Sequence, residues 1–241
     1  MTTYQLNSKN TQTWQQIRKP AEIAEARIIQ AILDNSFPIN SHLPGERELA
    51  EFLGVTRPTL RETLQRLERD GWVEIHQGKP TRVRDYWKEG CLGVLNTLAR
   101  HPDHLPDNFI PDLLTVRLAM APTYTAMAVE NAPEALSKLL DKHHTIEENP
   151  IAFAQFDWHV HHDLSILSGN SVFVMILNGF KELYLHLAPF YFSIPAARGH
   201  SLHFYHDLSL AATKHDPNQA RILTDMVMRE SIIFWQQIKL T

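Results

Sequence analysis

Hydrophobic residues follow different patterns on the two sides of about residue 90. Before it, short apolar periods of helical spacing are separated by Pro, Gly and Asn, and one stretch alternates between apolar and polar residues. After it, long windows of helical spacing dominate and the strand pattern disappears. The chain is therefore predicted to be mostly α, with a leader over 1–19, a first domain over 20–86 and a second domain over 91–241.

The first domain is predicted to hold three helices followed by a β-hairpin. A helix begins near Pro20, and four apolar residues then recur at helical spacing: Ile23, Ala26, Ile29 (or Ile28) and Leu33. Two short helices follow over 46–53 and 57–69, and Gly54 between them suits a left-handed turn. The alternating runs 72–75 and 81–84 then predict a small antiparallel hairpin.

Two short helices joined by a tight turn are typical of a helix-turn-helix, whose second helix lies in the major groove of DNA. Arginine can pair with guanine through two hydrogen bonds, and threonine can reach a phosphate or a thymine methyl group. The candidate contacts at the start of the second helix are Thr56, Arg57, Pro58, Thr59 and Arg61. The hairpin adds Lys79, Arg82 and Arg84, so this domain is interpreted as a winged helix-turn-helix. The open alternative is that these arginines form surface ion pairs with nearby glutamates.

The second domain is predicted to be an all-α antiparallel helical bundle. Its breaks fall at 101–102, 148–150, 168–170 and 216–217. Five windows are long enough for helices: 109–130, 151–167, 171–192, 199–214 and 217–238.

Composition excludes several classes of protein. With 44% hydrophobic and 21% charged residues, the chain is close to an average globular protein and unlike a disordered one. No window is long and apolar enough to span a membrane. The single cysteine, Cys91, excludes an intramolecular disulfide framework and favours a cytoplasmic protein. Phosphate-binding and dinucleotide-binding glycine motifs are absent from the sequence, so no enzyme is expected.

The net charge of -4 hides an uneven division. Residues 1–90 contain 13 Lys and Arg against 12 Asp and Glu, about +1, which leaves about -5 for residues 91–241. The first domain is therefore not strongly basic. A nucleic-acid partner would have to be recognised by a few well-placed arginines.

The segment LPGERELAEFLGVTRPTLRE at 43–62 resembles the GntR family of bacterial transcription regulators, and RDGWVEIHQGKPTRV at 69–83 resembles the fatty acid metabolism regulators within it. The likeness continues through LLTVR at 113–117, LNGFKELY at 177–184, FYHDLS at 204–209 and ESIIFW at 230–235. It covers roughly residues 20–238. The matching operator-contact positions are Arg47, Thr56, Arg57, Thr59, Arg61 and Gly78. Pro58, His76 and Gln77 depart from the usual pattern, which would retune the preferred operator.

The resemblance implies a homodimer that binds double-stranded operator DNA and senses long-chain fatty acyl-CoA in one cavity of the helical bundle. The residues that match positions around that ligand are Arg117, Tyr191, Ser231 and Trp235, together with Met228, which replaces a glycine. A Met there would narrow the pocket or pack on the acyl chain. The open alternative is that the aromatic stripe of these helices is ordinary packing core.

Many relatives with this type of second domain hold a divalent metal through one Asp and three His. Asp157, His161 and His206 fall on three of those positions, and Met228 falls on the fourth. Three ligands with a water or a ligand carboxylate in the fourth place would still suit Zn²⁺. The open alternative is that these residues form a vestigial or hydrogen-bonded polar cluster in the core. The alternative functions are therefore a metal-assisted sensor of a small organic acid, and a lipid- or metal-binding protein whose first domain makes only protein contacts. No metal is required by the acyl-CoA hypothesis.

Overall fold

The computed structural model describes residues 19–236, so residues 1–18 of the predicted leader over 1–19 lie outside the described residues. Contacts divide the chain into two compact units, residues 1–91 and 92–241. Each unit is described by itself. The end of the first domain at residue 86 and the start of the second domain at residue 91 stay predictions.

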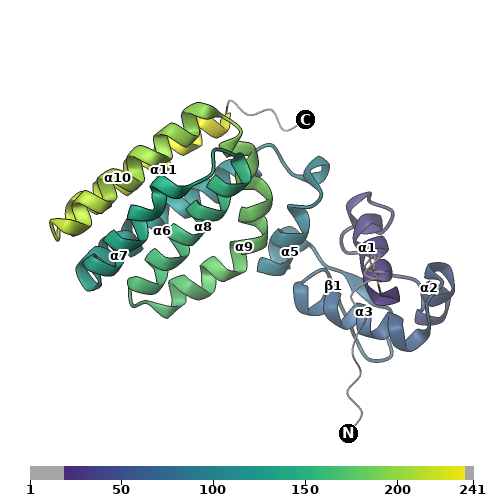
Figure 1. Cartoon of the computed structure of the whole chain (residues 1–241). Coiled ribbons are helices and arrows are strands. Elements are labelled where there is room, and N and C mark those ends of the chain that lie inside the picture. The colour runs from purple at the N-terminus through teal and green to yellow at the C-terminus, as the bar shows by residue number, and fades with distance from the viewer. Residues whose placement is uncertain (1–18, 237–241) are drawn as a thin grey trace, which may run out of the picture. The chain divides into compact units, whose positions relative to one another are not determined.

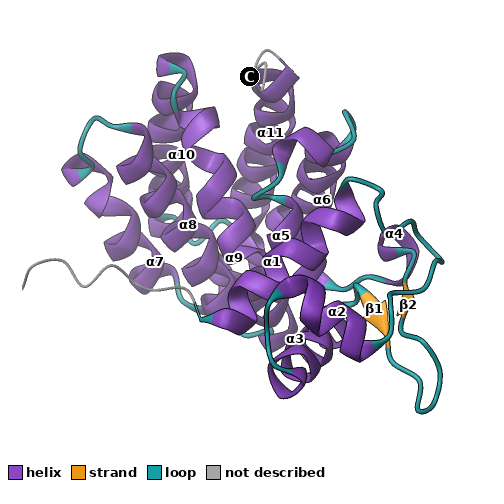
Figure 2. Cartoon of the chain, turned by 90° about the vertical axis from the view of Figure 1, so that its right-hand side faces the viewer, coloured by secondary structure: helices purple, strands orange, loops and turns teal. Residues whose placement is uncertain are grey.

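The first unit has the order helix, helix, helix, strand, strand, short helix. Its elements are α1 (Pro20–Leu33), α2 (Glu46–Leu53), α3 (Arg57–Asp70), β1 (Val73–Glu74), β2 (Arg82–Val83) and α4 (Tyr86–Glu89). The two strands pair antiparallel, with Val73 opposite Val83 (Figure 2). The predicted helix-turn-helix and hairpin are both present, although the strands are shorter than the runs that predicted them.

The turn between α2 and α3 depends on Gly54, whose φ of 69° lies in the left-handed region that other residues rarely adopt. This sharp turn brings the end of α2 next to the start of α3. The apolar side of α3, with Leu60, Leu64 and Leu67, is buried together with Trp72, which follows the helix. The core of the unit thereby fixes the exposed side of α3.

The buried face of α1 agrees with the predicted positions only in part, since Ile29 and its alternative Ile28 are both buried. Ile23 is 37% exposed, whereas the residues buried in the helix are Ala21, Ala24, Ile28, Ile29 and Ile32. The predicted residues and the buried residues of α1 both recur at helical spacing. The side chain of Thr63 on α3 donates a hydrogen bond to the carbonyl of Ala21, on the buried face of α1.

The second unit is helical throughout the described residues. Its elements are α5 (Leu92–Leu98), η1 (Pro102–His104), α6 (Phe109–Asn131), α7 (Pro133–Leu140), η2 (Asp141–Thr145), α8 (Pro150–Leu167), α9 (Ser171–Phe192), α10 (Pro195–Thr213) and α11 (Pro217–Gln236). The five predicted windows correspond to α6, α8, α9, α10 and α11. Proline at the first position of several of these helices explains why their starts could be predicted.

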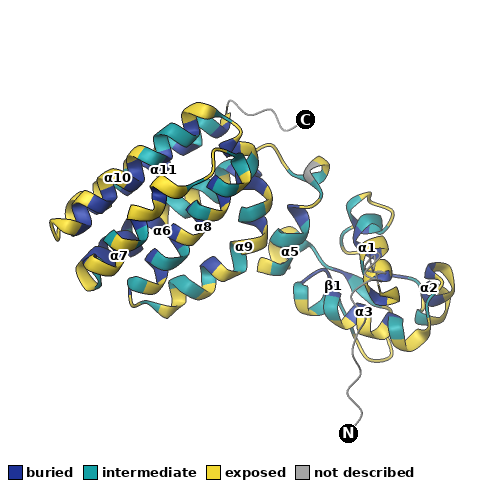
Figure 3. Ribbon diagram, in the orientation of Figure 1, coloured by how far each residue is buried: buried dark blue, intermediate teal, exposed yellow. Residues whose placement is uncertain are grey.

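The long helices pack side by side as a bundle (Figure 1). α6 contacts both α11 and α8, α8 contacts α9, and α10 contacts α7 and α11. The buried faces of these helices meet inside the bundle, while the outer faces are exposed (Figure 3). The helices described here do not include one long and apolar enough to cross a membrane.

Candidate functional site

The start of α3 is held in place by its own capping residue. Oγ1 of Thr56 accepts a hydrogen bond of 3.3 Å from the backbone N–H of Thr59 and lies 2.8 Å from the Thr59 hydroxyl oxygen. Pro58 lies inside the first turn, where its missing N–H costs nothing. The N-terminus of α3 is therefore well ordered, and its backbone dipole favours a negatively charged partner.

Two predicted DNA-binding arginines project from this first turn. Arg57 and Arg61 have side chains 57% and 60% exposed, and both face Glu46 at the start of α2, with N–O distances of 3.8 Å and 2.8 Å. Exposed ion pairs contribute little to stability. Glu46 thus orients the two guanidinium groups without burying them, and Arg47 beside it is exposed as well.

The tip of the hairpin is the second predicted contact region. The residues at this tip are all exposed: His76, Gln77, Gly78 and Lys79. Gly78 has a φ of 73°, which explains why a glycine occupies the turn. The predicted DNA contacts at the start of α3 and at the hairpin tip are therefore exposed, apart from Thr59, which is half-buried. Arg82 and Arg84 on the returning strand are half-buried as well.

The guanidinium of Arg82, an expected DNA contact, is engaged by other side chains of the first unit. Its guanidinium donates to Glu74 at 2.7 Å, to both carboxylate oxygens of Glu89 at 3.1 and 2.7 Å, and to Asn40 at 2.9 Å. Arg82 therefore ties the base of the hairpin to α4 and to the segment before α2. Arg84 is also half-buried, and its Nε atom has no hydrogen-bond partner among the described residues.

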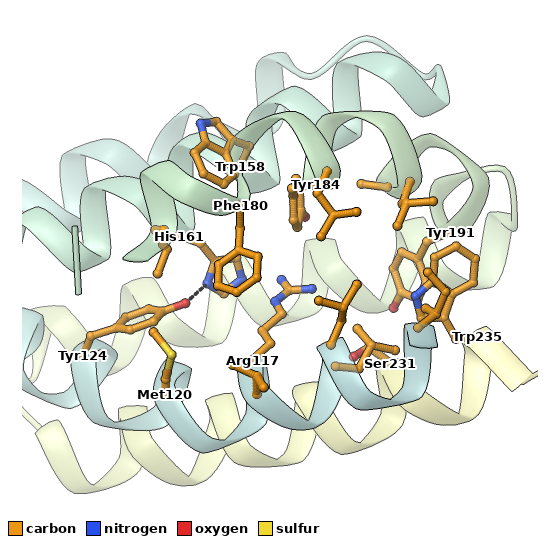
Figure 4. Close-up of a pocket in the computed structure, with 18 residues that line it drawn as sticks. Arg117, Met120, Tyr124, Trp158, His161, Phe180, Tyr184, Tyr191, Ser231 and Trp235 are labelled. Carbon is orange, nitrogen blue, oxygen red and sulfur yellow. Dashed lines mark hydrogen bonds between the residues drawn. The ribbon is translucent and has the colours of Figure 1, made fainter. Parts of the chain in front are cut away.

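The second unit contains a largely apolar cavity of about 130 Å³ between its long helices (Figure 4). α6, α8, α9 and α11 supply its walls. The lining residues are Ile110, Leu113, Leu114, Val116, Arg117, Met120, Tyr124, Trp158, His161, Leu177, Phe180, Leu183, Tyr184, Leu187, Ala188, Tyr191, Ser231 and Trp235. Among these eighteen described residues, only Arg117 belongs to the Lys, Arg, Asp and Glu class.

Four of the five predicted ligand residues line this cavity: Arg117, Tyr191, Ser231 and Trp235. Met228 does not line it. Its side chain is 3% exposed and packs in the hydrophobic core of the bundle. Met228 therefore lies one helical turn before the lining residue Ser231 and contributes to the core of the bundle instead.

Asp157 is the centre of a buried polar network at the cavity wall. One oxygen of its carboxylate accepts a hydrogen bond of 2.9 Å from Arg117 and a short one from Tyr184, and the other accepts a bond of 2.7 Å from Tyr205. His161 lies one helical turn further along α8, with Nδ1 2.9 Å from the hydroxyl of Tyr124. The four helices α6, α8, α9 and α10 are thus joined by this network.

Burial and charge act in opposite directions on these groups. Burial raises the pKa of Asp157, but His161, Arg117 and the two tyrosine hydroxyls outweigh burial and hold that pKa below its ordinary value. Burial and the Arg117 charge lower the pKa of His161 to about 3, although Asp157 opposes them. At neutral pH the network therefore contains a carboxylate, a guanidinium and a neutral imidazole.

The expected metal set of Asp157, His161 and His206 is not assembled. His206 is exposed on α10, with its ring centroid 6.4 Å from that of His143. The preceding residue, Tyr205, faces Asp157 instead, because adjacent positions on an α-helix differ in direction by about 100°. Within residues 19–236, no group of three or more His, Cys, Asp or Glu is placed to hold a metal ion. The residues present do not fit a divalent cation, and none is assigned here.

Sequence reasoning missed several cavity residues. Tyr124 follows Arg117 by two helical turns on the same face of α6, so helical spacing alone would have found it. Trp158 and His161 come from α8, which had been considered only for a metal. Tyr205, which donates to Asp157 but does not line the cavity, had no signal in the sequence, since its role depends on the packing of α10.

Two family profiles match the chain and together cover residues 20–241. The profile of the bacterial regulatory proteins, gntR family, matches residues 20–83, and the FadR C-terminal domain matches residues 84–241. The two profiles meet directly after the hairpin.

Curated relatives carry the same name. A fatty acid metabolism regulator protein of Shewanella sp. strain ANA-3 is 44% identical over 196 residues, which is 80% of this chain and 80% of the relative. A fatty acid metabolism regulator protein of Shewanella amazonensis is 41% identical over 223 residues, or 91% of this chain and 92% of the relative.

A solved structure of Lar, which controls expression of the agr system in Listeria monocytogenes, has the same fold. It superimposes with a TM-score of 0.63 at 15% identity and covers 92% of this chain and 99% of its own. At this identity the likeness concerns the fold alone.

Proposed function

The chain belongs to the GntR family of bacterial regulatory proteins, with the C-terminal domain of the FadR regulators, and we propose that it is a homodimeric transcription regulator of fatty acid metabolism that long-chain fatty acyl-CoA releases from its operator. DNA binding is the general function of this family. The ligand, the dimer and the residue roles are the proposed part.

Operator binding is supported by the exposed start of α3. Arg57 and Arg61 share Glu46 as a partner and remain available to base edges or phosphates. A two-fold dimer would place two such helices on a pseudo-palindromic site, because the symmetry of the protein matches that of the half-sites.

The shape of the cavity is the observation that carries the ligand proposal. The lining residues of α6 run from Ile110 to Tyr124 and those of α9 from Leu177 to Tyr191. Each row is about 21 Å long at the rise of an α-helix. A long, narrow and mostly apolar wall of this kind suits an extended acyl chain better than a small, charged organic acid.

The size of the cavity supports a conformational response. At about 130 Å³ it is smaller than the ~300–1,000 Å³ of pockets that hold drug-sized ligands. An acyl chain would therefore have to separate α9 from α6, which favours a different arrangement of the bundle. A ligand that binds the DNA-incompetent arrangement more tightly lowers DNA affinity by its differential affinity.

A titration tests the ligand proposal. Operator DNA recovered from genomic fragments by affinity selection is labelled, and its fluorescence anisotropy with the protein is followed as palmitoyl-CoA, CoA or palmitate is added. We expect release by palmitoyl-CoA and not by CoA alone. Trp235→Ala and Ser231→Ala should bind operator normally but need more palmitoyl-CoA for release.

Ile233→Ala is the matched control, because Ile233 lies on the same helix but is 57% exposed and outside the cavity. Unchanged release in both cavity variants would contradict the proposal. Native mass spectrometry tests the dimer: the expected mass is twice 27.7 kDa per complex, and any co-purified acyl ligand appears in the same spectrum.

A further inference from the structure

The polar groups of the cavity are not evenly distributed along it. Ser231 and Trp235 lie towards one end, while Arg117 and His161 lie nearer to Tyr124 (Figure 4). The two regions differ in how well their hydrogen bonds are satisfied. Ser231 donates to the carbonyl of Met228 at 2.7 Å and so already has a partner.

His161 is the buried lining residue with an unsatisfied nitrogen. Its side chain is 4% exposed, and its Nε2 atom has no hydrogen-bond partner among residues 19–236. The nearest carboxylate oxygen, on Asp157, is 3.7 Å away, which is too far for a hydrogen bond. A buried polar atom without a partner is costly and rare in native proteins.

The surroundings of His161 decide which nitrogen carries the proton. The negative charge of Asp157 lies on the Nε2 side and favours a hydrogen there. Nδ1 then accepts from the hydroxyl of Tyr124, 2.9 Å away. Nε2–H is therefore a donor at the wall of an apolar cavity, and an acceptor on the ligand would satisfy it.

Charge restricts what that acceptor is. The Arg117 guanidinium beside His161 is already balanced by Asp157 at 2.9 Å. A ligand carboxylate at this point would add an uncompensated buried charge, whereas a neutral oxygen would not. We propose that Nε2 of His161 donates a hydrogen bond to a neutral oxygen of the acyl ligand and selects ligands that place such an oxygen at this depth.

This proposal rests on the proposed function, because it presumes that an acyl ligand occupies the cavity. Two oxygens have the required chemistry: the thioester carbonyl, and a hydroxyl or keto oxygen further along the chain. The test uses three kinds of ligand: palmitoyl-CoA, S-hexadecyl-CoA, which lacks the carbonyl, and a series of palmitoyl-CoA analogues hydroxylated at successive chain positions.

Dissociation constants for the full-length protein are measured by isothermal titration calorimetry. In the wild type we expect one oxygen to strengthen binding about three- to ten-fold over the ligand without it, the range of one hydrogen bond. A preference for palmitoyl-CoA over S-hexadecyl-CoA identifies the carbonyl, and a preference for a hydroxylated analogue identifies a chain oxygen.

The variants then assign that preference to His161. His161→Phe keeps a ring of similar size without the donor. It should reduce the ratio of the dissociation constants of the ligands without and with the oxygen to about one. His161→Gln retains a donor and should keep part of it. His162→Phe, on the same helix but outside the cavity, should leave it unchanged. Melting temperature and operator affinity serve as folding controls, and Tyr124→Phe provides a second variant that should also reduce the ratio.

The two proposals fail in different ways. If the CoA derivatives bind the wild type but no oxygen is preferred, or His161→Phe and Tyr124→Phe keep the full preference, the role of His161 is refuted and the proposed function stands. If none of the CoA derivatives binds the wild type, the proposed function itself is refuted, and the inference about His161 is refuted with it.

Discussion

Nη2 of Arg117 lies 2.9 Å from Oδ2 of Asp157, which joins α6 to α8 through an ion pair at the wall of the cavity. The side chains are 21% and 5% exposed, so both charges have lost most of their water. The Coulomb attraction of a buried pair offsets that loss only where further hydrogen bonds complete it. Tyr184 and Tyr205 supply those bonds to Asp157.

Removing Asp157 should destabilise the bundle strongly. Asp157→Ala leaves the Arg117 charge without its partner, and losses of about 3–5 kcal/mol are typical for one half of a buried pair. Urea denaturation followed by circular dichroism measures the free energy of unfolding. The control is Asp225→Ala, which breaks an exposed pair with Arg229 on α11 and should have little effect. Equal effects of the two substitutions would show that the buried pair is not important for stability.

The neutral state of His161 should make stability depend on pH. Its folded pKa is about 3 because of burial and the Arg117 charge, whereas an unfolded histidine has a pKa near 6.5. Below pH ~6.5 the unfolded chain takes up a proton that the folded chain rejects. Stability should therefore fall as pH falls, by up to about 1.4 kcal/mol per pH unit.

The measurement compares the free energy of unfolding at pH 7, 6 and 5. His161→Phe should lose this part of the slope, and His162→Phe should keep it. Asp157 affects stability at lower pH than His161, because its pKa in the folded protein is held below the ordinary value. Its contribution to the free energy of unfolding is complete above pH ~4 and is lost as the pH falls through the folded pKa. A wild-type slope that survives in His161→Phe would assign the effect to other groups.

Thr56 combines a structural role with a proposed DNA contact, and the two roles can be separated. Thr56→Ala removes the cap on the Thr59 N–H and should cost about 0.5–2 kcal/mol. Thr56→Asp keeps a capping oxygen, so thermal stability should be close to that of the wild type. The added negative charge faces the DNA phosphates and should abolish operator binding, as measured by anisotropy. Normal binding by Thr56→Asp would place Thr56 away from the DNA.

Arg57 and Arg82 should behave differently, although both lie in the winged helix-turn-helix. Arg57 is exposed, and within residues 19–236 its ion pair is with Glu46 at 3.8 Å, so Arg57→Ala should weaken operator binding about ten- to hundred-fold. Arg82 is engaged by Glu74 and Glu89, so Arg82→Ala should lower the melting temperature first.

Titrations at several salt concentrations distinguish the two cases. A lost phosphate contact reduces the slope of log K against log salt by about one, while a destabilised hairpin does not. Arg69→Ala, at the other end of α3 and paired with Asp70, is the control. A reduced slope of log K against log salt in Arg82→Ala would instead indicate that Arg82 contacts a phosphate of the DNA.

Much of the fold could be predicted because local signals coincide with its boundaries. Proline at position 150 begins α8, and Gly169 with a φ of 74° separates α8 from α9. These residues restrict the backbone whatever the tertiary context. The four cavity residues that match the family pattern were expected from that resemblance, and no local signal in the sequence marks them.

What could not be predicted depends on the rotation of one helix against another. A shift of one residue on α10 puts Tyr205 rather than His206 at Asp157, and a similar rotation puts Met228 in the core instead of the cavity. The buried face of α1 differs from the predicted positions at Ile23, Ala26 and Leu33 for the same reason. Two sets of positions on a helix have equal spacing, and only packing partners decide between them.

The last prediction concerns how the cavity communicates with the start of the second unit. Asn96 on α5 donates from Nδ2 to the carbonyl of Gly179 at 3.0 Å and accepts from the N–H of Leu183 at 3.2 Å. In a regular α-helix these two backbone groups pair with each other. A side chain inserted at such a point allows a helix to bend, and Leu183 itself lines the cavity.

If an acyl chain displaces α9, Asn96 would transmit the displacement to α5, which follows directly after the first unit in the chain. Asn96→Ala should therefore bind palmitoyl-CoA with little change in affinity. It should, however, reduce the ratio between the operator affinity without ligand and the operator affinity with ligand. For coupled sites this ratio is typically about 5- to 150-fold. Asn96→Asp keeps the acceptor and loses the donor, so its ratio should be intermediate. Thr97→Ala, which removes a bond within α5 to Gly93, should keep the full ratio. Full coupling in Asn96→Ala would mean that the response travels by another route, since the only change would be the loss of the two bonds to α9.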